Sequence, residues 1–167
     1  MPNLSYIFIP SPVGQLKLIA NEKALVAVLW ETDRPNRVLL GDMQQDQDHP
    51  ILNMAKQQLM AYFQGQRHQF DLPLEFYGTE FQKKVWDELL KIPYGEKRSY
   101  LDIATAIGNP KAVRAVGAAN GKNPISIIAP CHRVIGKNGQ LVGFAGGLDV
   151  KDQLLKLEHT FALLSTH

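Results

Sequence analysis

The spacing of apolar residues changes along this chain, and the change constrains the fold more than any other feature of the sequence. Three short apolar runs occupy the first thirty residues, at 6–9, 16–19 and 25–30. Turn residues such as Pro10 and Gly14 separate them, which predicts a small antiparallel sheet with hairpin connections. After a polar stretch at 33–48, apolar residues recur every three or four positions over 51–63, as in a helix with one buried face.

The remainder of the chain predicts a mostly helical part. The expected helices are one capped by Thr79 and ending before Pro93, one from Ser99 to Ile107, one over 111–119, and one from Val150 to about Leu157. Asn109 and Pro110 are expected to start the third of these as N-cap and first helical residue. Gly108 separates the second helix from the third, so the two together predict a helix-turn-helix. The irregular stretch 66–78 predicts a boundary between domains at 1–77 and 78–167.

The chain holds one cysteine, Cys131, among 167 residues. A single thiol excludes an intramolecular disulfide, and structural zinc sites usually draw on two to four cysteines, so we expect no metal. A chain of this length buries roughly two-thirds of its unfolded surface and can form a core without such a cross-link. The cysteine is therefore either a small buried hydrophobe or a group with a chemical role.

Basic residues concentrate in the second part of the chain, although the net charge is only +2. Residues 78–167 hold 12 Lys and Arg against 8 Asp and Glu, and the excess is greatest over 95–137. Such a cluster is usually a solvated face, but it also suits a polyanion such as nucleic acid. The longest apolar run, 24–30, is too short to cross a bilayer, and no secretory signal precedes it. We expect a soluble cytoplasmic protein without membrane contact.

The segment Pro130-Cys131-His132-Arg133 is the strongest candidate for chemistry. It follows an apolar run and precedes a glycine-rich loop, a setting in which an exposed, activated thiolate could form. Neighbouring side chains generally do not face one another, so we expect contact between the thiol of Cys131 and the imidazole of His132 to run through a water. A third, acidic group that orients the imidazole must come from elsewhere in the chain. A buried Cys beside an ordinary surface His would look the same in sequence.

These residues resemble those of the O6-alkylguanine-DNA alkyltransferases, also called methylated-DNA–protein-cysteine methyltransferases. The resemblance is dense from Gly78 to about Glu158, and the first 77 residues match more loosely. Its motifs are Arg-Ala-Val-Gly at 114–117, Asn-Pro at 123–124, Pro-Cys-His-Arg-Val at 130–134, Gly-Gly at 146–147 and the helix that ends near Glu158. It implies an α/β fold of the α+β kind, with a ribonuclease-H-like sheet and helix before a helical domain that contains the helix-turn-helix.

The resemblance implies a role for each residue of the reaction. Cys131 would take the alkyl group from guanine O6 in one irreversible displacement, so that each molecule reacts once. His132 would deprotonate the thiol through a bound water, and Glu158 would orient and polarise His132. Asn123 would be the hinge that links the helix-turn-helix to the active-site segment. Without the resemblance, Glu158 would read as a solvated carboxylate and Asn123 as a turn residue.

The same resemblance implies double-stranded DNA containing O6-alkylguanine as the partner, with O4-alkylthymine as an alternative lesion. The damaged nucleotide would be flipped out of the duplex. Arg114 would fill the space it leaves, and Tyr100 would push the phosphate and donate a proton to the guanine. Asn109 and Lys137 would touch the DNA strand. The family docks the second helix of the motif in the minor groove, and the alanines and Gly117 on that helix keep it slim.

Phe144 and Ala145 would line the pocket for the alkyl group. The family commonly has Tyr at the position of Phe144, so the hydroxyl is absent here while the aromatic wall remains. Ala145 is small and leaves room for larger alkyl groups. We expect no cofactor and a monomer, with cooperative assembly on DNA left open.

Three alternatives compete with this interpretation. A catalytically silent protein that binds alkylated DNA would lack the reactive cysteine, which Cys131 argues against. A helix-turn-helix transcription factor would need more base-reading side chains than Lys111 and Arg114 supply. A Cys–His hydrolase would place its His far from the Cys in sequence, whereas here the two are adjacent.

Overall fold

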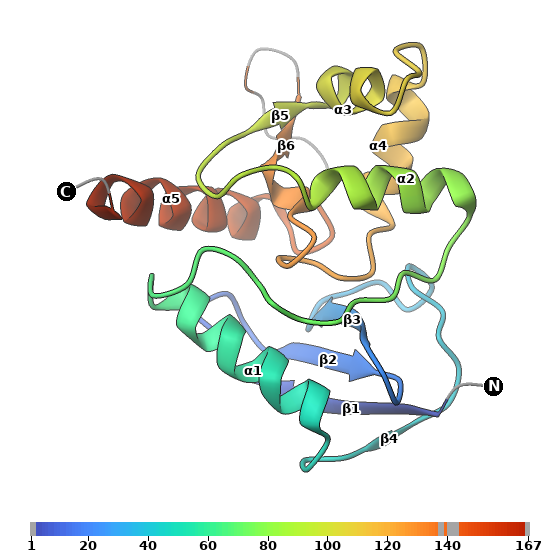
Figure 1. Cartoon of the computed structure of the whole chain (residues 1–167), viewed down its shortest axis with the longest axis vertical. Helices are drawn as coiled ribbons and strands as arrows, with labels where there is room; N and C mark the ends of the chain where they lie inside the picture. The colour runs from blue at the N-terminus through green and yellow to red at the C-terminus, as the bar shows by residue number, and fades with distance from the viewer. Residues whose placement is uncertain (1–2, 137–138, 140–143, 166–167) are drawn as a thin grey trace.

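The fold is mixed, with a sheet in its first half and helices in its second (Figure 1). The computed structural model describes residues 3–136, 139 and 144–165. The first sheet has the order β3-β2-β1-β4, with strands β1 (Leu4–Ile9), β2 (Leu16–Ala20), β3 (Leu25–Trp30) and β4 (Met43–Gln45). The first three strands pair antiparallel, as the sequence predicts. Strand β4 pairs parallel with β1 and was not predicted, because its three residues lie in a polar stretch without alternation.

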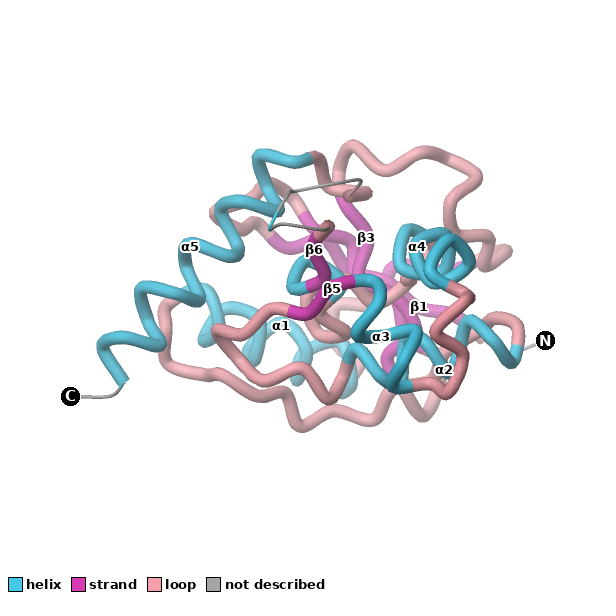
Figure 2. Tube along the Cα trace, turned by 90° about the horizontal axis from the view of Figure 1, so that it is seen from above, coloured by secondary structure: helices cyan, strands magenta, loops and turns pink. Residues whose placement is uncertain are grey.

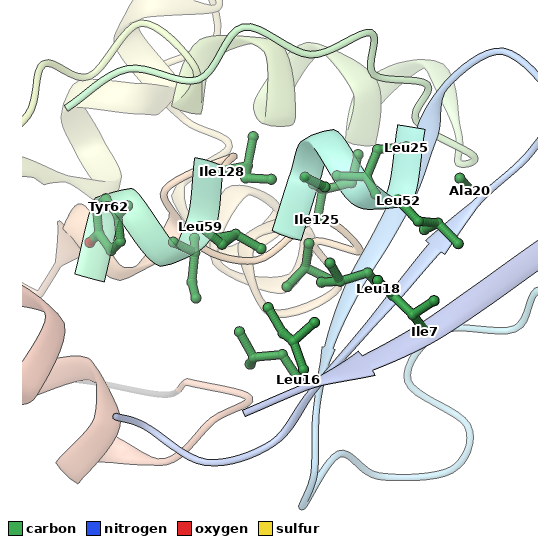
Figure 3. Packing of buried hydrophobic residues seen from close by; sticks show 14 of the residues in the cluster. Ile7, Leu16, Leu18, Ala20, Leu25, Leu52, Leu59, Tyr62, Ile125 and Ile128 are labelled. Atoms are coloured by element: carbon green, nitrogen blue, oxygen red, sulfur yellow. The ribbon is translucent and has the colours of Figure 1, made fainter. Parts of the chain in front are cut away.

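Helix α1 (Pro50–Phe63) lies across the sheet and confirms the helix predicted from the spacing over 51–63. Its buried residues, Leu52, Ala55, Leu59 and Tyr62, follow that spacing. Figure 3 shows Leu52 and Leu59 above the sheet residues Leu16 and Leu18. Burial of these apolar surfaces is the main favourable term that holds α1 to the sheet. Ile125 and Ile128 join the same cluster from the second half of the chain.

A segment without helix connects α1 to α2 (Glu80–Leu89). Within it, Leu74 forms a bridge with Leu25, so the segment runs beside the outer strand β3. Helix α2 begins at a capping box, in which the Thr79 side chain accepts from Gln82 N and the Gln82 side chain accepts from Thr79 N. The division into domains at residues 77 and 78 stays a prediction.

The predicted helix-turn-helix is formed by α3 (Tyr100–Ala106) and α4 (Val113–Gly121). The prediction that Asn109 caps the second of these helices was wrong. The Asn109 amide donates to Ala104 O at 2.9 Å and the Gly108 amide to Thr105 O at 3.0 Å, so Asn109 closes the end of α3. A turn follows, in which Ala112 N donates to Asn109 O, and α4 starts only at Val113 without a side-chain cap.

Two very short strands join the helix-turn-helix to the cysteine segment. Strand β5 (Arg98–Ser99) pairs parallel with β6 (Val134–Ile135), and η1 (Cys131–Arg133) immediately precedes β6. Figure 2 shows this pair beside the start of α3. The residues before η1 attach to the first sheet, where Val28 bridges Ile125. The cysteine segment is thus fixed to both halves of the molecule.

The last helix, α5 (Leu148–Ser165), is longer than the predicted 150–157. Its continuation packs against the first half, since the ring of Phe161 lies 2.2 Å from where a Cβ on Gly65 would stand. Gly65 also has φ +76°, so both its backbone and this close approach require glycine. No helix among the described residues is long and apolar enough to cross a membrane.

Candidate active site

Cys131 lies at the first position of η1. Its amide donates to Ala129 O at 2.8 Å, and it belongs to the hydrophobic cluster of α2, α3 and α4. The residue is only 4% exposed. The sequence left open whether the thiol is exposed or buried, and in the structure it is buried. The preceding segment is strained, because buried Ile127 adopts φ +72°, a conformation that β-branched residues rarely take.

The surroundings of Cys131 act on its thiol in opposite directions. Burial raises the pKa of Cys131, while a hydrogen bond from Asn123 and the positive charges of Arg37 and Lys151 lower it in part. The thiol is therefore the resting form at neutral pH, and reaction at its sulfur requires a base. The charged groups around it would stabilise the thiolate once the proton has left.

His132 is completely buried and lies against the carboxylate of Glu158, with Nε2 2.6 Å from Oε2. Since the carboxylate accepts a hydrogen bond, we assign the imidazole hydrogen to Nε2, which leaves Nδ1 as an acceptor. Nδ1 is buried and has no hydrogen-bond partner among the described residues. Burial lowers the pKa of His132, although Glu158 opposes this, so the ring is neutral at neutral pH and can accept a proton at Nδ1.

Glu158 on α5 is the carboxylate that the Cys–His pair requires, and it is 1% exposed. Arg133 holds it with two bonds, Nε to Oε1 at 2.7 Å and Nη2 to Oε2 at 3.0 Å. Burial alone would raise the pKa of Glu158, but His132 and Arg133 outweigh it and hold the pKa well below its usual range. The carboxylate is ionised, and Arg133 balances its charge, so His132 need not be protonated to do so.

Asn123 is fully buried and connects α4 to the cysteine segment. Its side-chain Nδ2 donates to Ala129 O at 2.8 Å, and its Oδ1 accepts from Ile125 N at 3.1 Å. Both ends of the amide are used to fold the chain between α4 and η1. The structure therefore places the predicted residues Cys131, His132, Glu158 and Asn123 together, and their roles stay predictions.

Two buried cations near the site were missed in the sequence. Arg37 forms an ion pair with Asp33 and donates to Gly121 O at 3.2 Å and to Asn123 O at 2.8 Å. Lys151 on α5 donates to Val134 O at 2.6 Å, and burial lowers its pKa. Neither could be found from local pattern, because each acts on backbone atoms far away in sequence. Lys151 stands among the polar residues Asp149, Asp152 and Gln153 at the start of α5, so nothing in the local sequence marked it as buried.

The residues predicted to meet DNA lie on and beside the helix-turn-helix. Tyr100 opens α3 and lies next to α4, with its ring 4.0 Å from where a Cβ on Gly117 would stand. Burial raises the pKa of Tyr100, the Asn120 amide opposes this, and a thiolate at Cys131 would raise it further. Arg114 is exposed on α4, and Asn109 is exposed in the turn before it. Lys137 lies outside the described residues.

The predicted pocket residues Phe144 and Ala145 are partly buried and pack against the core. The ring of Phe144 meets that of Trp30 edge to face at 5.4 Å, and the Lys151 Nζ lies 6.0 Å from its centroid. A Cβ on Gly146 would stand 2.9 Å from the Trp30 ring, so glycine permits this close approach. In the part of the chain that the structure describes, no three His, Cys, Asp or Glu side chains are grouped to hold a metal ion.

The fold and the site thus define a protein built around one buried cysteine beside a helix-turn-helix. Two family models match the chain. Residues 4–76 match the ribonuclease-like domain of 6-O-methylguanine DNA methyltransferase, and residues 80–160 match its DNA binding domain. The chain belongs to the 6-O-methylguanine DNA methyltransferase family.

Individual proteins agree with this assignment. The chain is 48% identical to the methylated-DNA–protein-cysteine methyltransferase of Methanosarcina barkeri over 153 residues, which cover 92% of this chain and 96% of that protein. It is 48% identical to the constitutive enzyme of Bacillus subtilis over 157 residues, which cover 92% of this chain and 94% of that protein. The crystal structure of Mycobacterium tuberculosis OGT in complex with DNA matches with a TM-score of 0.86 and 45% identity, covering 94% of each chain.

Proposed function

We propose that this protein repairs DNA by direct reversal, moving the alkyl group of O6-alkylguanine to Sγ of its own Cys131. The observation that carries the proposal is the buried contact of 2.6 Å between His132 Nε2 and Glu158 Oε2. His132 directly follows Cys131, the single cysteine of the chain. DNA is the partner, because the chain carries the family's DNA binding domain. Relatives of nearly equal length are named methylated-DNA–protein-cysteine methyltransferases. The protein is accordingly a stoichiometric methylated-DNA–protein-cysteine S-methyltransferase.

The reaction begins with the thiol proton. A water takes this proton from Cys131 and passes one to Nδ1 of His132, while Glu158 holds the Nε2 hydrogen. Sγ then attacks the alkyl carbon, so that an S–C bond forms as the C–O6 bond breaks. The electron pair of that bond stays on the guanine, which takes a proton from Tyr100, and the proton held by His132 restores the phenol. In sum, the thiol hydrogen ends on guanine and the alkyl group ends on sulfur.

The buried position of Cys131 explains why the nucleotide must leave the duplex. A sulfur that is 4% exposed cannot reach a base inside a stack. Helix α4 presents exposed Arg114, Ala115 and Ala118, a slim face that suits close approach to a minor groove. Arg114 would take the place of the extruded base, and Asn109 and Lys137 would contact the strand. Phe144 and Ala145 would bound the pocket for the alkyl group.

All four predicted reaction residues come from one chain, which supports action as a monomer.

The test of the proposed alkyl transfer is intact-protein mass spectrometry after incubation with a duplex that contains O6-methylguanine. We expect one added methylene per molecule, on the peptide that contains Cys131. The variant Cys131→Ala should gain no mass, and Glu158→Gln should react more slowly. An undamaged duplex is the matched control.

A silent protein that binds the lesion without reacting is the alternative, and the curated relatives do not favour it. Tight binding of the damaged duplex without any change in protein mass would establish it. In that case the roles proposed for Cys131, His132 and Glu158 would be wrong.

A further inference from the structure

The hydroxyl of Tyr62 donates a hydrogen bond to the Glu158 carboxylate, and the reaction scheme above gives this contact no role. This hydroxyl lies 2.6 Å from Oε2, the same oxygen that His132 contacts. Tyr62 belongs to α1, 96 residues away in sequence and in the other half of the molecule. Its hydroxyl is therefore a group from the first half that touches the proton relay directly.

The two oxygens of Glu158 are differently occupied. Oε1 accepts from Arg133 Nε at 2.7 Å and from Gly95 N at 3.3 Å. Oε2 accepts from Tyr62, from His132 and from Arg133 Nη2, three donors on one atom. Each donor on Oε2 withdraws electron density from it, so the Tyr62 bond limits how strongly the carboxylate attracts the His132 hydrogen.

Packing alone does not account for a tyrosine at this position. The ring of Tyr62 contacts Phe63, Phe70 and Tyr94 at centroid distances of 5.3, 5.6 and 6.1 Å, which a phenylalanine ring could also do. Tyr62 is fully buried, and the other buried residues of α1 are apolar. A buried hydroxyl is costly unless it is bonded, and here the carboxylate of Glu158 accepts it.

The charged and titratable groups around this contact favour donation by Tyr62. Burial and the Glu158 charge raise the pKa of Tyr62 well above its usual value, so the hydroxyl keeps its proton. Two further groups lie near this contact. Tyr94 is in the turn before β5, and burial raises its pKa to about 12. Arg133 is on η1. Lys151 faces His132 from α5.

We propose that Tyr62 is a positioning residue for alkyl transfer, which holds the Glu158 carboxylate against His132 and moderates its pull on the imidazole hydrogen. The inference rests on the proposed function, because it concerns the same relay. Through the Tyr62 hydroxyl, the first half of the chain contributes to the reaction as well as to the hydrophobic core.

The change Tyr62→Phe should have an effect with a definite sign. Without the third donor, Oε2 attracts the Nε2 hydrogen more strongly, which raises the pKa of His132 and leaves less neutral imidazole at a given pH. The acidic limb of the rate–pH profile should move to higher pH. The transfer rate at neutral pH should fall roughly three- to tenfold, since a hydrogen bond to a charged group is lost.

The experiment measures the single-turnover rate constant of methyl transfer from an O6-methylguanine duplex between about pH 5.5 and 8.5. The matched control is Tyr77→Phe, which removes a hydroxyl bonded to Asn21 Nδ2 at 2.9 Å, away from the relay. This control should leave both the rate and the profile unchanged. Thermal unfolding and duplex affinity of each variant show whether folding or binding has changed instead.

A double-mutant cycle separates positioning from mere structure. In the Glu158→Gln background, Tyr62→Phe should slow transfer by less than about twofold, because the carboxylate it acts on is gone. An unchanged profile for folded Tyr62→Phe would overturn the inference, as would equal slowing in both backgrounds. If the wild-type protein transfers no methyl group, the proposed function fails with it, whereas normal transfer by Tyr62→Phe refutes only the role of Tyr62.

Discussion

At the residue scale, Glu158 balances the charges of the buried site, and its loss should be costly. Replacing it with Gln leaves the Arg133 guanidinium buried without a counter-ion, because the remaining partner of Arg133 is the Ile92 carbonyl. We expect Glu158→Gln to lower the free energy of unfolding by about 3 kcal/mol at neutral pH, measured by urea denaturation. The control Glu80→Gln, at a side chain 92% exposed, should cost less than about 1 kcal/mol.

The same carboxylate gives stability a dependence on pH. The hydrogen bond from His132 and the ion pair with Arg133 hold the pKa of Glu158 below the unfolded value of about 4.3. The folded state then binds fewer protons than the unfolded state, so the stabilisation is complete above that value and is lost as the pH falls through the acid range. The difference in unfolding free energy between wild type and Glu158→Gln should therefore shrink from pH 7 to about pH 3. A difference that stays constant would mean that His132 and Arg133 do not set this pKa.

At the scale of elements, the exposed face of α4 should control access to DNA. Ala118 is exposed on this helix, and a carboxylate there would meet the phosphates of a docked duplex. We expect Ala118→Glu to weaken duplex binding on the order of tenfold at low salt, with an unchanged unfolding midpoint. Fluorescence anisotropy measures the binding. Gln57→Glu, which adds the same charge to the exposed face of α1, should bind as the wild type does; equal weakening by both would refute docking at α4.

Elements with a strong local signal were predictable, and those that depend on distant partners were not. The apolar spacing predicted β1 to β3 and α1, and the cap at Thr79 predicted the start of α2. Strands β4, β5 and β6 have two or three residues each, too few to show alternation. The Asn-Pro pair suggested a helix start, but the glycine before it required Asn109 to close α3 instead.

The candidate site shows the same division. The Pro-Cys-His-Arg motif identified Cys131 and His132 at once, whereas Glu158 was found only through resemblance to a family. Tyr62 and Arg37 escaped notice because each contacts the site across more than 80 residues of sequence. A long-range hydrogen bond leaves no mark on local hydrophobic spacing, so only the folded chain shows which buried polar residue meets which partner.

At the scale of the whole molecule, one added carbon on Cys131 should destabilise the fold. The sulfur belongs to a cluster formed by α2, α3 and α4, and the segment before it is tied to β3 through the Val28–Ile125 bridge. This segment already holds Ile127 in a strained conformation, so it has little freedom to move aside. Extra methylenes in a packed core typically cost about 1–3 kcal/mol.

For a chain of this size, that cost lowers the unfolding midpoint by roughly 2–10 °C. Calorimetry of the protein before and after complete methylation, confirmed by mass, measures the shift. Cys131→Ala carried through the same incubation should show none, which separates alkylation of the sulfur from any effect of the DNA. Equal midpoints for the native and methylated protein would show that the site accepts the methyl group without repacking. A lower unfolding midpoint for the methylated protein would show that the stability of the whole fold depends on whether the Cys131 sulfur carries a methyl group.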